Sequence, residues 1–182
     1  MKTITAPTTI QKIPELTWMT SKLLENNVES LVVVGSYHGG VEWHIARAYA
    51  AWGKKISMTS IDPVDCVQRR QSSIEVVMDF KQHHQFINGT RDAFPVGEKA
   101  DAVFIDSDHS YSAVKKDFNF AINVAKKMII FHDIVNSLYH QKHGCWVSTL
   151  WDEIKKSGAK TEEMMGDDWA GIGIVYVSRK RA

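Results

Sequence analysis

The sequence is poor in cysteine, in net charge and in long apolar runs, and each absence excludes a class of protein. Its two cysteines, Cys66 and Cys145, form neither a disulfide framework nor a metal-ligand spacing, which is typical of reduced thiols in a cytoplasmic protein. The net charge of +1 gives no reason to expect a nucleic acid or an anionic membrane as partner. Apolar runs are only a few residues long, and the amino-terminal region lacks a signal-peptide pattern. We therefore predict a cytoplasmic protein with neither a membrane nor a nucleic-acid partner.

The sequence also lacks internal repeats, low-complexity tracts and linkers. A chain of 182 residues with 44% hydrophobic content fits one domain with a substantial core. We therefore predict a single domain over residues 1–182. Its first ten residues are rich in threonine, and we expect them to be loosely ordered.

Hydrophobic periodicity along the chain alternates between strands and helices. Short apolar strands are predicted at 30–34, 55–61, 86–87, 102–105 and 128–131, and helices at 13–27, 41–52, 69–83, 114–125 and 147–156. This alternation predicts an α/β fold with a doubly wound, mostly parallel sheet. Two further strands, 160–165 and 171–177, are joined by a short turn, so they must form an antiparallel hairpin at the carboxyl end.

Polar, ionisable side chains follow two of these strands directly. The segment Ala102-Val-Phe-Ile-Asp-Ser-Asp-His-Ser-Tyr111 carries Asp106, Asp108 and His109, and Met128-Ile-Ile-Phe-His-Asp133 carries His132 and Asp133. The carboxyl ends of neighbouring parallel strands line one crevice, where ligands bind in such sheets. The two segments therefore predict one shared site.

A glycine-rich turn, Val32-Val-Val-Gly-Ser-Tyr-His-Gly-Gly-Val41, joins the first strand to its helix. It matches neither G-x-G-x-x-G nor a phosphate-binding loop, and a tight turn alone also needs glycine. Asp62 ends the second strand, where a carboxylate can accept both hydroxyls of a ribose, although Asp is also a common helix cap. Asn88-Gly-Thr-Arg-Asp92 follows the third strand and offers polar groups to an adenine edge, or forms a surface turn. Three such strand ends together favour a nucleoside site.

These segments resemble the motifs of class I methyltransferases that use S-adenosylmethionine. The similarity covers Val33-Val-Gly-Ser-Tyr-His-Gly-Gly40, Ser60-Ile-Asp-Pro63, Val103-Phe-Ile-Asp-Ser-Asp-His-Ser-Tyr111, Ile129-Ile-Phe-His-Asp133 and Gly171-Ile-Gly-Ile-Val175. The third string resembles the small-molecule O-methyltransferase branch that includes cephalosporin-hydroxylase-type and macrolide-sugar methyltransferases. The resemblance implies a Rossmann-like methyltransferase fold, with seven strands in the order 3-2-1-4-5-7-6.

The resemblance also implies roles for individual residues. The turn residues would bind the methionine end of S-adenosylmethionine, Asp62 the ribose, and Asp106 would lie beside the sulfonium, with Asp92 and its neighbours flanking the adenine. The implied turn residues are Gly35, Ser36, Tyr37, Gly39 and Gly40. One departure is notable, because the family usually has an acidic residue two positions before the first glycine, where this chain has Val33. The departure predicts either weaker cofactor binding or transfer of that role to another group.

Methyl transfer to a hydroxyl also needs a base or a cation that removes the proton. His109 is the candidate base, with Asp106 and Asp133 as further catalytic candidates, although His109 is also placed to fix a helix start. In the metal-dependent relatives, the ligands correspond to Asp106, His132 and Asp133. Carboxylates suit Mg²⁺, whereas a histidine favours another divalent cation. The alternative is that Asp106 only orients the cofactor and Asp133 caps a turn.

The predicted function is therefore methyl transfer from S-adenosylmethionine to a hydroxyl of a small molecule or sugar. A non-catalytic S-adenosylmethionine or nucleoside-binding protein, and a nicotinamide-dependent oxidoreductase, are the alternatives. The chain has little material for acceptor contacts beyond its amino-terminal helix and the segment 134–146, so we expect a small acceptor pocket or one completed in a homo-oligomer. His140 and His143 in that segment are expected to be exposed, His83 and His84 to end a helix, Trp151 to lie in the core, and Trp169 to precede the last strand, where it could face the cleft.

Overall fold

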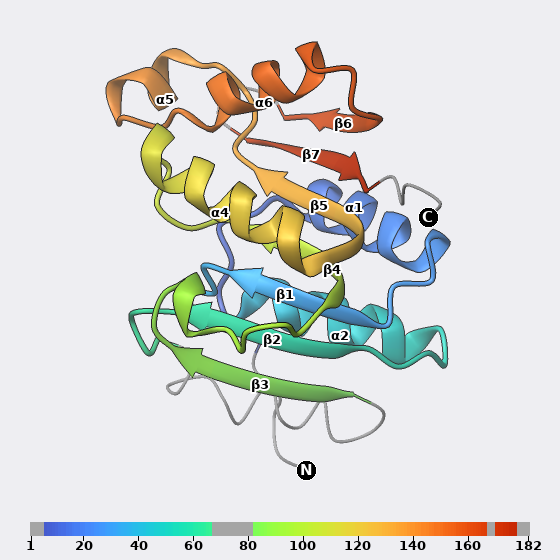
Figure 1. Cartoon of the computed structure of the whole chain (residues 1–182). Coiled ribbons are helices and arrows are strands. Elements are labelled where there is room, and N and C mark those ends of the chain that lie inside the picture. Colours follow the sequence, from blue (N-terminus) through green and yellow to red (C-terminus); the bar gives the residue numbers. More distant parts are fainter. Residues whose placement is uncertain (1–5, 67–81, 167–169, 178–182) are drawn as a thin grey trace.

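The protein forms one seven-stranded sheet with helices on both faces (Figure 1). The structure is a computed structural model that describes residues 6–66, 82–166 and 170–177. The strand order is β3-β2-β1-β4-β5-β7-β6, which confirms the predicted order. The strands are β1 (Ser30–Val34), β2 (Ser57–Asp62), β3 (His83–Asn88), β4 (Ala100–Ile105), β5 (Ala125–His132), β6 (Thr161–Met165) and β7 (Gly171–Tyr176).

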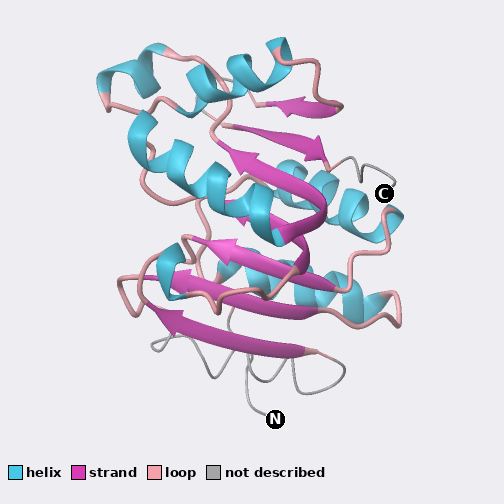
Figure 2. Cartoon of the chain, viewed as in Figure 1, coloured by secondary structure: helices cyan, strands magenta, loops and turns pink. Residues whose placement is uncertain are grey.

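The helices divide between the two faces of the sheet (Figure 2). The helices α1 and α2 cover one face, while α4 and α6 cover the other. They are α1 (Ile13–Glu25), α2 (Gly40–Ala51), α4 (Tyr111–Val124), α5 (Leu138–Lys142) and α6 (Val147–Lys156), with a short 3₁₀ turn η1 (Arg91–Ala93) before β4. Among the described residues, no helix combines the length and the apolarity that a bilayer crossing requires.

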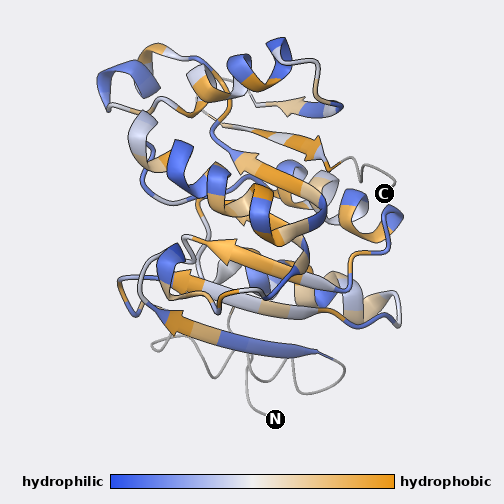
Figure 3. Ribbon diagram, in the orientation of Figure 1, coloured by the Kyte–Doolittle hydropathy of each residue, from blue (hydrophilic) through white to orange (hydrophobic). Residues whose placement is uncertain are grey.

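Side-chain alternation along the central strands supplies both cores. In β1, Val33 packs with α1 and α2, whereas Val32 and Val34 pack with α4 and α6. Every residue of β4 is buried, as expected for a parallel strand covered on both faces. Figure 3 shows the resulting contrast between the hydrophobic central strands and the edge strand β3, which is hydrophilic along its first half.

The carboxyl-terminal hairpin is antiparallel, as predicted. Strand β7 pairs antiparallel with both β5 and β6, with Phe131 opposite Gly173. A Cβ on Gly173 would lie 2.7 Å from the Trp151 indole, so β7 passes directly against that ring. Trp151 is buried in the core, which confirms its predicted position.

The structure corrects three local predictions. His83 and His84 begin β3 instead of ending a helix. The prediction was wrong because β3 is a half-solvated edge strand, and its polar residues give no apolar strand pattern in the sequence. Strand β5 begins at Ala125, directly after α4, and not at Met128, since Lys126 and Lys127 interrupt the apolar signal. The segment 134–146, for which no helix was predicted, contains the five-residue helix α5. The predicted helix 69–83 and Trp169 lie outside the described residues, apart from positions 82 and 83.

Candidate functional site

A cleft of about 580 Å³ lies at the carboxyl ends of β1, β2 and β4. This volume is in the range of small-molecule and cofactor pockets. Residues from these strand ends, from the turn after β3 and from the amino-terminal segment line it, among them Gly35, Ser36, Asp62, Thr90, Asp106 and His109. The structure therefore brings together the glycine turn and the two acidic strand ends that the sequence singled out.

The turn after β1 depends on its glycines for geometric reasons. Gly35 has φ +88°, and a Cβ there would lie 2.0 Å from the Asp106 carbonyl oxygen, so the turn and the end of β4 are in direct backbone contact. Gly39 has φ +76° and precedes the first residue of α2. A Cβ on Gly40 would meet Thr8, because residues 8–11 lie across the turn and form part of the cleft wall. Residues 8–11 therefore lie against the site, although they form no helix or strand.

Asp62 fixes the shape of this turn. Its Oδ2 accepts hydrogen bonds from the backbone N–H groups of Ser36 at 2.9 Å and Tyr37 at 3.0 Å, and its Oδ1 accepts one from Val64 at 2.8 Å. A carboxylate has about four lone-pair positions, so these three bonds leave capacity for a ligand hydroxyl. Asp62 thus holds the turn as well as facing the cleft, a second role that the sequence did not indicate.

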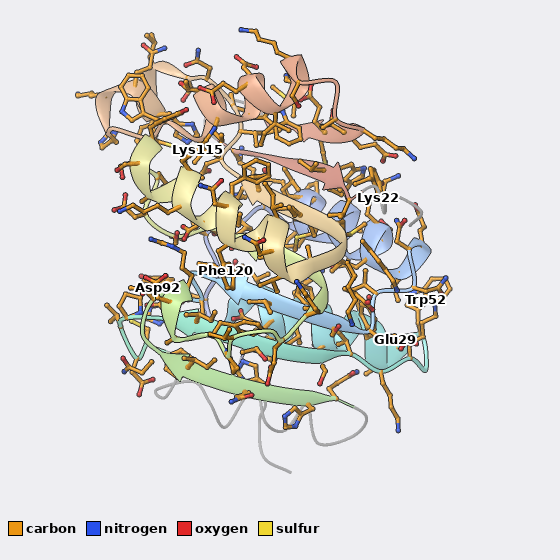
Figure 4. All side chains as sticks on the ribbon, in the orientation of Figure 1. Lys22, Glu29, Trp52, Asp92, Lys115 and Phe120 are labelled. Atoms are coloured by element: carbon orange, nitrogen blue, oxygen red, sulfur yellow. The ribbon has the colours of Figure 1, made fainter. Side chains whose placement is uncertain are left out.

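The polar turn after β3 contributes Thr90 and Arg91 to the cleft. Asp92, which is labelled in Figure 4, is exposed and is not among the lining residues. The Arg91 guanidinium is 2.6 Å from the Asp117 carboxylate of α4, which is almost fully buried. This ion pair connects the turn after β3 to the helix on the front of the sheet. The sequence anticipated the turn but not which of its residues face the cleft.

The second part of the site is a cluster of histidines and carboxylates at the ends of β4 and β5. The Nε2 of His109 lies 3.2 Å from Asp106 Oδ1 and 3.4 Å from Asp133 Oδ2. The Nδ1 of His132 lies 3.0 Å from Asp133 Oδ1 and 3.6 Å from Asp106 Oδ1. All four predicted side chains therefore meet at one point.

Two buried atoms of this cluster lack hydrogen-bond partners. They are His132 Nδ1 and Asp133 Oδ1, and both residues are almost completely buried. Asp133 has φ +58°, an uncommon conformation for a residue other than glycine. Ligand atoms of Asp106, His132 and Asp133 lie within 4.8 Å of one another, as do those of His109, Asp133 and Cys145. Unpaired donor atoms at such spacing fit a bound cation.

The charges in the cluster shift its titrations. Burial raises the pKa of Asp106, but the charge of His132 and a hydrogen bond with His109 outweigh it and hold that pKa below its usual range. Burial lowers the pKa of His132, but Asp106 outweighs this effect and the pKa lies well above the usual value. Burial also lowers the pKa of His109, but the hydrogen bond with Asp106 outweighs this effect, so that pKa lies above its usual value. The cluster therefore stabilises positive charge.

Three supporting residues were missed from the sequence. Glu15 of α1 accepts a hydrogen bond from the Gly171 N–H at 2.5 Å and places Oε2 3.5 Å from His132 Nε2. The Gln11 side-chain amide donates to Asp106 Oδ2. His140 is buried, contrary to prediction: its Nδ1 donates to the Val135 carbonyl at 2.6 Å, and its Nε2 lies 3.6 Å from Asp133 Oδ1. Of the three, only Glu15 could have been singled out from the local sequence, because it is an acid at the third position of a helix that has a proline in its first turn.

Cys145 lies beside this cluster, and its thiol is kept in the protonated, unreactive form. It is buried and free, and burial raises its pKa to about 11. Neither Cys66 nor Cys145 forms a disulfide, which agrees with the prediction.

Comparisons with known proteins agree with this geometry. A family model described as a methyltransferase domain matches residues 32–134, which is more than half of the chain. A search of curated protein sequences finds no significant match.

Solved structures share the fold at low sequence identity. An O-methyltransferase from Bacillus cereus, in complex with SAH, has a TM-score of 0.66 at 12% identity, covering 94% of this chain and 84% of that one. The O-methyltransferase TomG from Streptomyces achromogenes, involved in tomaymycin synthesis and in complex with SAM, has a TM-score of 0.66 at 11% identity, covering 92% and 81%. The N-methyltransferase NodS from Bradyrhizobium japonicum has a TM-score of 0.61 at 11% identity, covering 91% and 97%.

Proposed function

This chain belongs to the family of methyltransferase domains, and from that premise we propose that it transfers a methyl group from S-adenosylmethionine to a hydroxyl of a small molecule or sugar. The observation that carries the proposal is the cleft that joins the glycine turn and Asp62 to Asp106 and His109. Two structural neighbours are named as O-methyltransferases, which supports a hydroxyl acceptor, while a third is an N-methyltransferase.

The cofactor fits the donor groups along this cleft. The first turn of α2, which begins at Gly40 in the cleft wall, presents N–H groups to the carboxylate of the methionine end. The N–H groups of residues 35–37 and of Gly39 are already hydrogen-bonded within the protein and fix the shape of the turn. Asp62 keeps an acceptor position for the ribose, and the turn of Thr90 and Arg91 takes the adenine. The Asp106 carboxylate offers negative charge beside the sulfonium. When bound, S-adenosylmethionine supplies an electrophilic methyl group.

His109 is proposed as the general base. It lines the cleft, and its Nε2 lies near both Asp106 and Asp133, which stabilise the imidazolium that forms when the ring takes up the acceptor's hydroxyl proton. The new bond joins the acceptor oxygen to the methyl carbon, and the bond from that carbon to sulfur breaks. Correct alignment of these groups supplies a large part of the rate acceleration.

A divalent cation is proposed at Asp106, His132 and Asp133. The unpaired His132 Nδ1 and Asp133 Oδ1 support it, because a cation would satisfy both atoms. When bound, it would make the acceptor hydroxyl more acidic. The histidine in this set favours a transition-metal ion such as Mn²⁺ over Mg²⁺.

Isothermal titration of the protein with S-adenosylmethionine and S-adenosylhomocysteine, with and without Mg²⁺ or Mn²⁺, tests the proposal. We expect micromolar binding that Asp62→Asn weakens and that Asp92→Asn, at an exposed residue outside the cleft lining, leaves unchanged. Binding that never leads to methylation across a panel of hydroxyl acceptors would support the non-catalytic alternative. The absence of binding to either compound would contradict the proposal.

A further inference from the structure

A fully buried carboxyl group, that of Glu42, lies behind the glycine turn. Glu42 is in the first turn of α2, has an exposed fraction of 0%, and is not among the residues that line the cleft. Burial raises its pKa, which favours the neutral form of the carboxyl. Such a residue calls for an explanation, because a buried carboxyl is costly unless its contacts serve a purpose.

The contacts of Glu42 join the glycine turn to two neighbouring strands. Its Oε1 accepts hydrogen bonds from Ser36 Oγ and from Ser60 Oγ, each at 2.5 Å. Ser60 Oγ is also 2.9 Å from His84 Nε2. Because the single Ser60 proton is donated to Glu42, the His84 nitrogen must be the donor in that pair. One carboxyl oxygen therefore ties the glycine turn to β2 and, through Ser60, to β3.

The position of this carboxyl relates to Val33. In the β1–β2 register Val33 lies beside Ser60, and Val33 packs on the face of the sheet that α1 and α2 cover. Glu42 approaches Ser60 from α2, so its carboxyl lies beside the β2 residue that pairs with Val33, the position at which the resemblance described above implies an acid. The other oxygen, Oε2, is buried and has no hydrogen-bond partner, so stability alone would favour an apolar residue there.

We propose that Glu42 is a positioning residue for the cofactor: it holds Ser36, and with it the turn of residues 35–40, in the shape that binds the methionine end of S-adenosylmethionine, in place of an acid at position 33. This inference rests on the proposed function, since it assumes that the turn binds that cofactor. Glu42 acts through Ser36, which lines the cleft and whose N–H group is also bound by Asp62.

The central test compares two substitutions at one site. Glu42→Gln keeps an oxygen that accepts from both serines, whereas Glu42→Met fills a similar volume without an acceptor. Calorimetric titration with S-adenosylhomocysteine at pH 7.5 should give a Kd within about threefold of wild type for the Gln variant and at least tenfold weaker for the Met variant. Rescue by Gln is the readout that a simple packing role would not produce.

Ile45→Val provides the matched control. Ile45 is equally buried on the same helix and packs in the hydrophobic core. The substitution should lower the unfolding temperature and leave the Kd unchanged. If Glu42→Met does not fold, Glu42→Asp carries the test, because the shorter side chain keeps the carboxyl group but loses the reach to both serines. It too should bind at least tenfold more weakly.

A relocation variant makes the test stricter. Val33→Glu combined with Glu42→Met returns the acid to β1 beside Ser60 and should recover most of the lost affinity. Equal Kd values for wild type and Glu42→Met would overturn the inference while leaving the proposed function intact. Failure of the wild-type protein itself to bind would instead contradict the proposed function.

Discussion

The Nδ1 of His132 and the Oδ1 of Asp133 are 3.0 Å apart, yet neither atom makes a hydrogen bond. The two residues are adjacent in sequence, and both side chains are buried at the carboxyl end of β5. The left-handed backbone of Asp133 turns its carboxylate toward Asp106 and the three surrounding histidines. Carboxylate and imidazole atoms gathered this closely are arranged as the ligands of a cation are.

Asp133→Asn should weaken the binding of Mn²⁺ at least tenfold, because it removes a charged donor from the set. Calorimetric titration of the metal-free protein with MnCl₂ measures this change. Asp92→Asn is the control, since it also removes one carboxylate charge, but from an exposed position. An unchanged Mn²⁺ affinity in Asp133→Asn would exclude this residue as a ligand.

His109→Gln should reduce the turnover number by ~10²- to 10⁴-fold, the usual contribution of a general base. The Kd for S-adenosylmethionine should change little, because the proposed role of the ring concerns the acceptor proton. A methylation assay with any accepted substrate, combined with titration calorimetry, separates the two effects. His143→Gln, at an exposed histidine of the neighbouring segment, should retain full activity.

Gly35→Ala should destabilise the protein severely and abolish cofactor binding. The new Cβ would meet the Asp106 carbonyl oxygen at 2.0 Å, so the end of β4 would have to move. Gly97→Ala isolates the backbone contribution, because Gly97 has φ +86°, close to the +88° of Gly35, and nothing lies within 4 Å of its added Cβ. We expect Gly97→Ala to cost only about 1–2 kcal/mol of unfolding free energy. Similar losses in both variants, measured by urea denaturation, would contradict the role of the close approach.

Protonation of His84 should make the protein less stable in mild acid. Burial lowers its pKa from 6.5 to about 4, so the unfolded chain takes up the proton first as the pH falls. This group therefore leaves stability unaffected above pH 6.5 and reduces it progressively between pH 6.5 and pH 4. Between pH 7 and pH 4, wild type should lose about 2–3 kcal/mol more unfolding free energy than His84→Gln does.

Urea denaturation at a series of pH values measures this difference. His83→Gln, at the exposed neighbouring residue, should keep the wild-type pH dependence. Parallel stability curves for wild type and His84→Gln would show that the ring is not protected from protonation in the folded state.

The sequence predicted the parts of the fold that depend on local pattern. Apolar strands with polar residues at their carboxyl ends sufficed for the mostly parallel sheet, the antiparallel hairpin and the meeting of Asp62, Asp106 and Asp133 at one edge. The strand order was implied by the resemblance to a known family and not by the pattern. The resemblance to class I methyltransferases is confirmed by the family match. That match also favours methyl transfer over the nicotinamide-dependent alternative.

The contacts that complete the site could not be predicted in the same way. Glu15 reaches Gly171 and Gln11 reaches Asp106 across long stretches of sequence, and nothing local marks such pairs. His84 was misplaced because an edge strand shows little apolar pattern, and His140 because a five-residue helix is too short for periodicity to show its buried side. Glu42 was overlooked because a charged residue in the first turn of a helix is usually solvated.

The segment of residues 8–11 forms a wall of the cleft without belonging to a helix or strand. Its Gln11 amide is bound to the same Asp106 that is proposed to face the sulfonium. A ligand that fills the cleft therefore also contacts this wall. The enthalpy and entropy of binding measured by calorimetry will include the ligand's contacts with these residues as well as its contacts with the strand ends. Shortening the chain before α1 would thus alter the thermodynamic signature of binding even though the strand ends stay intact.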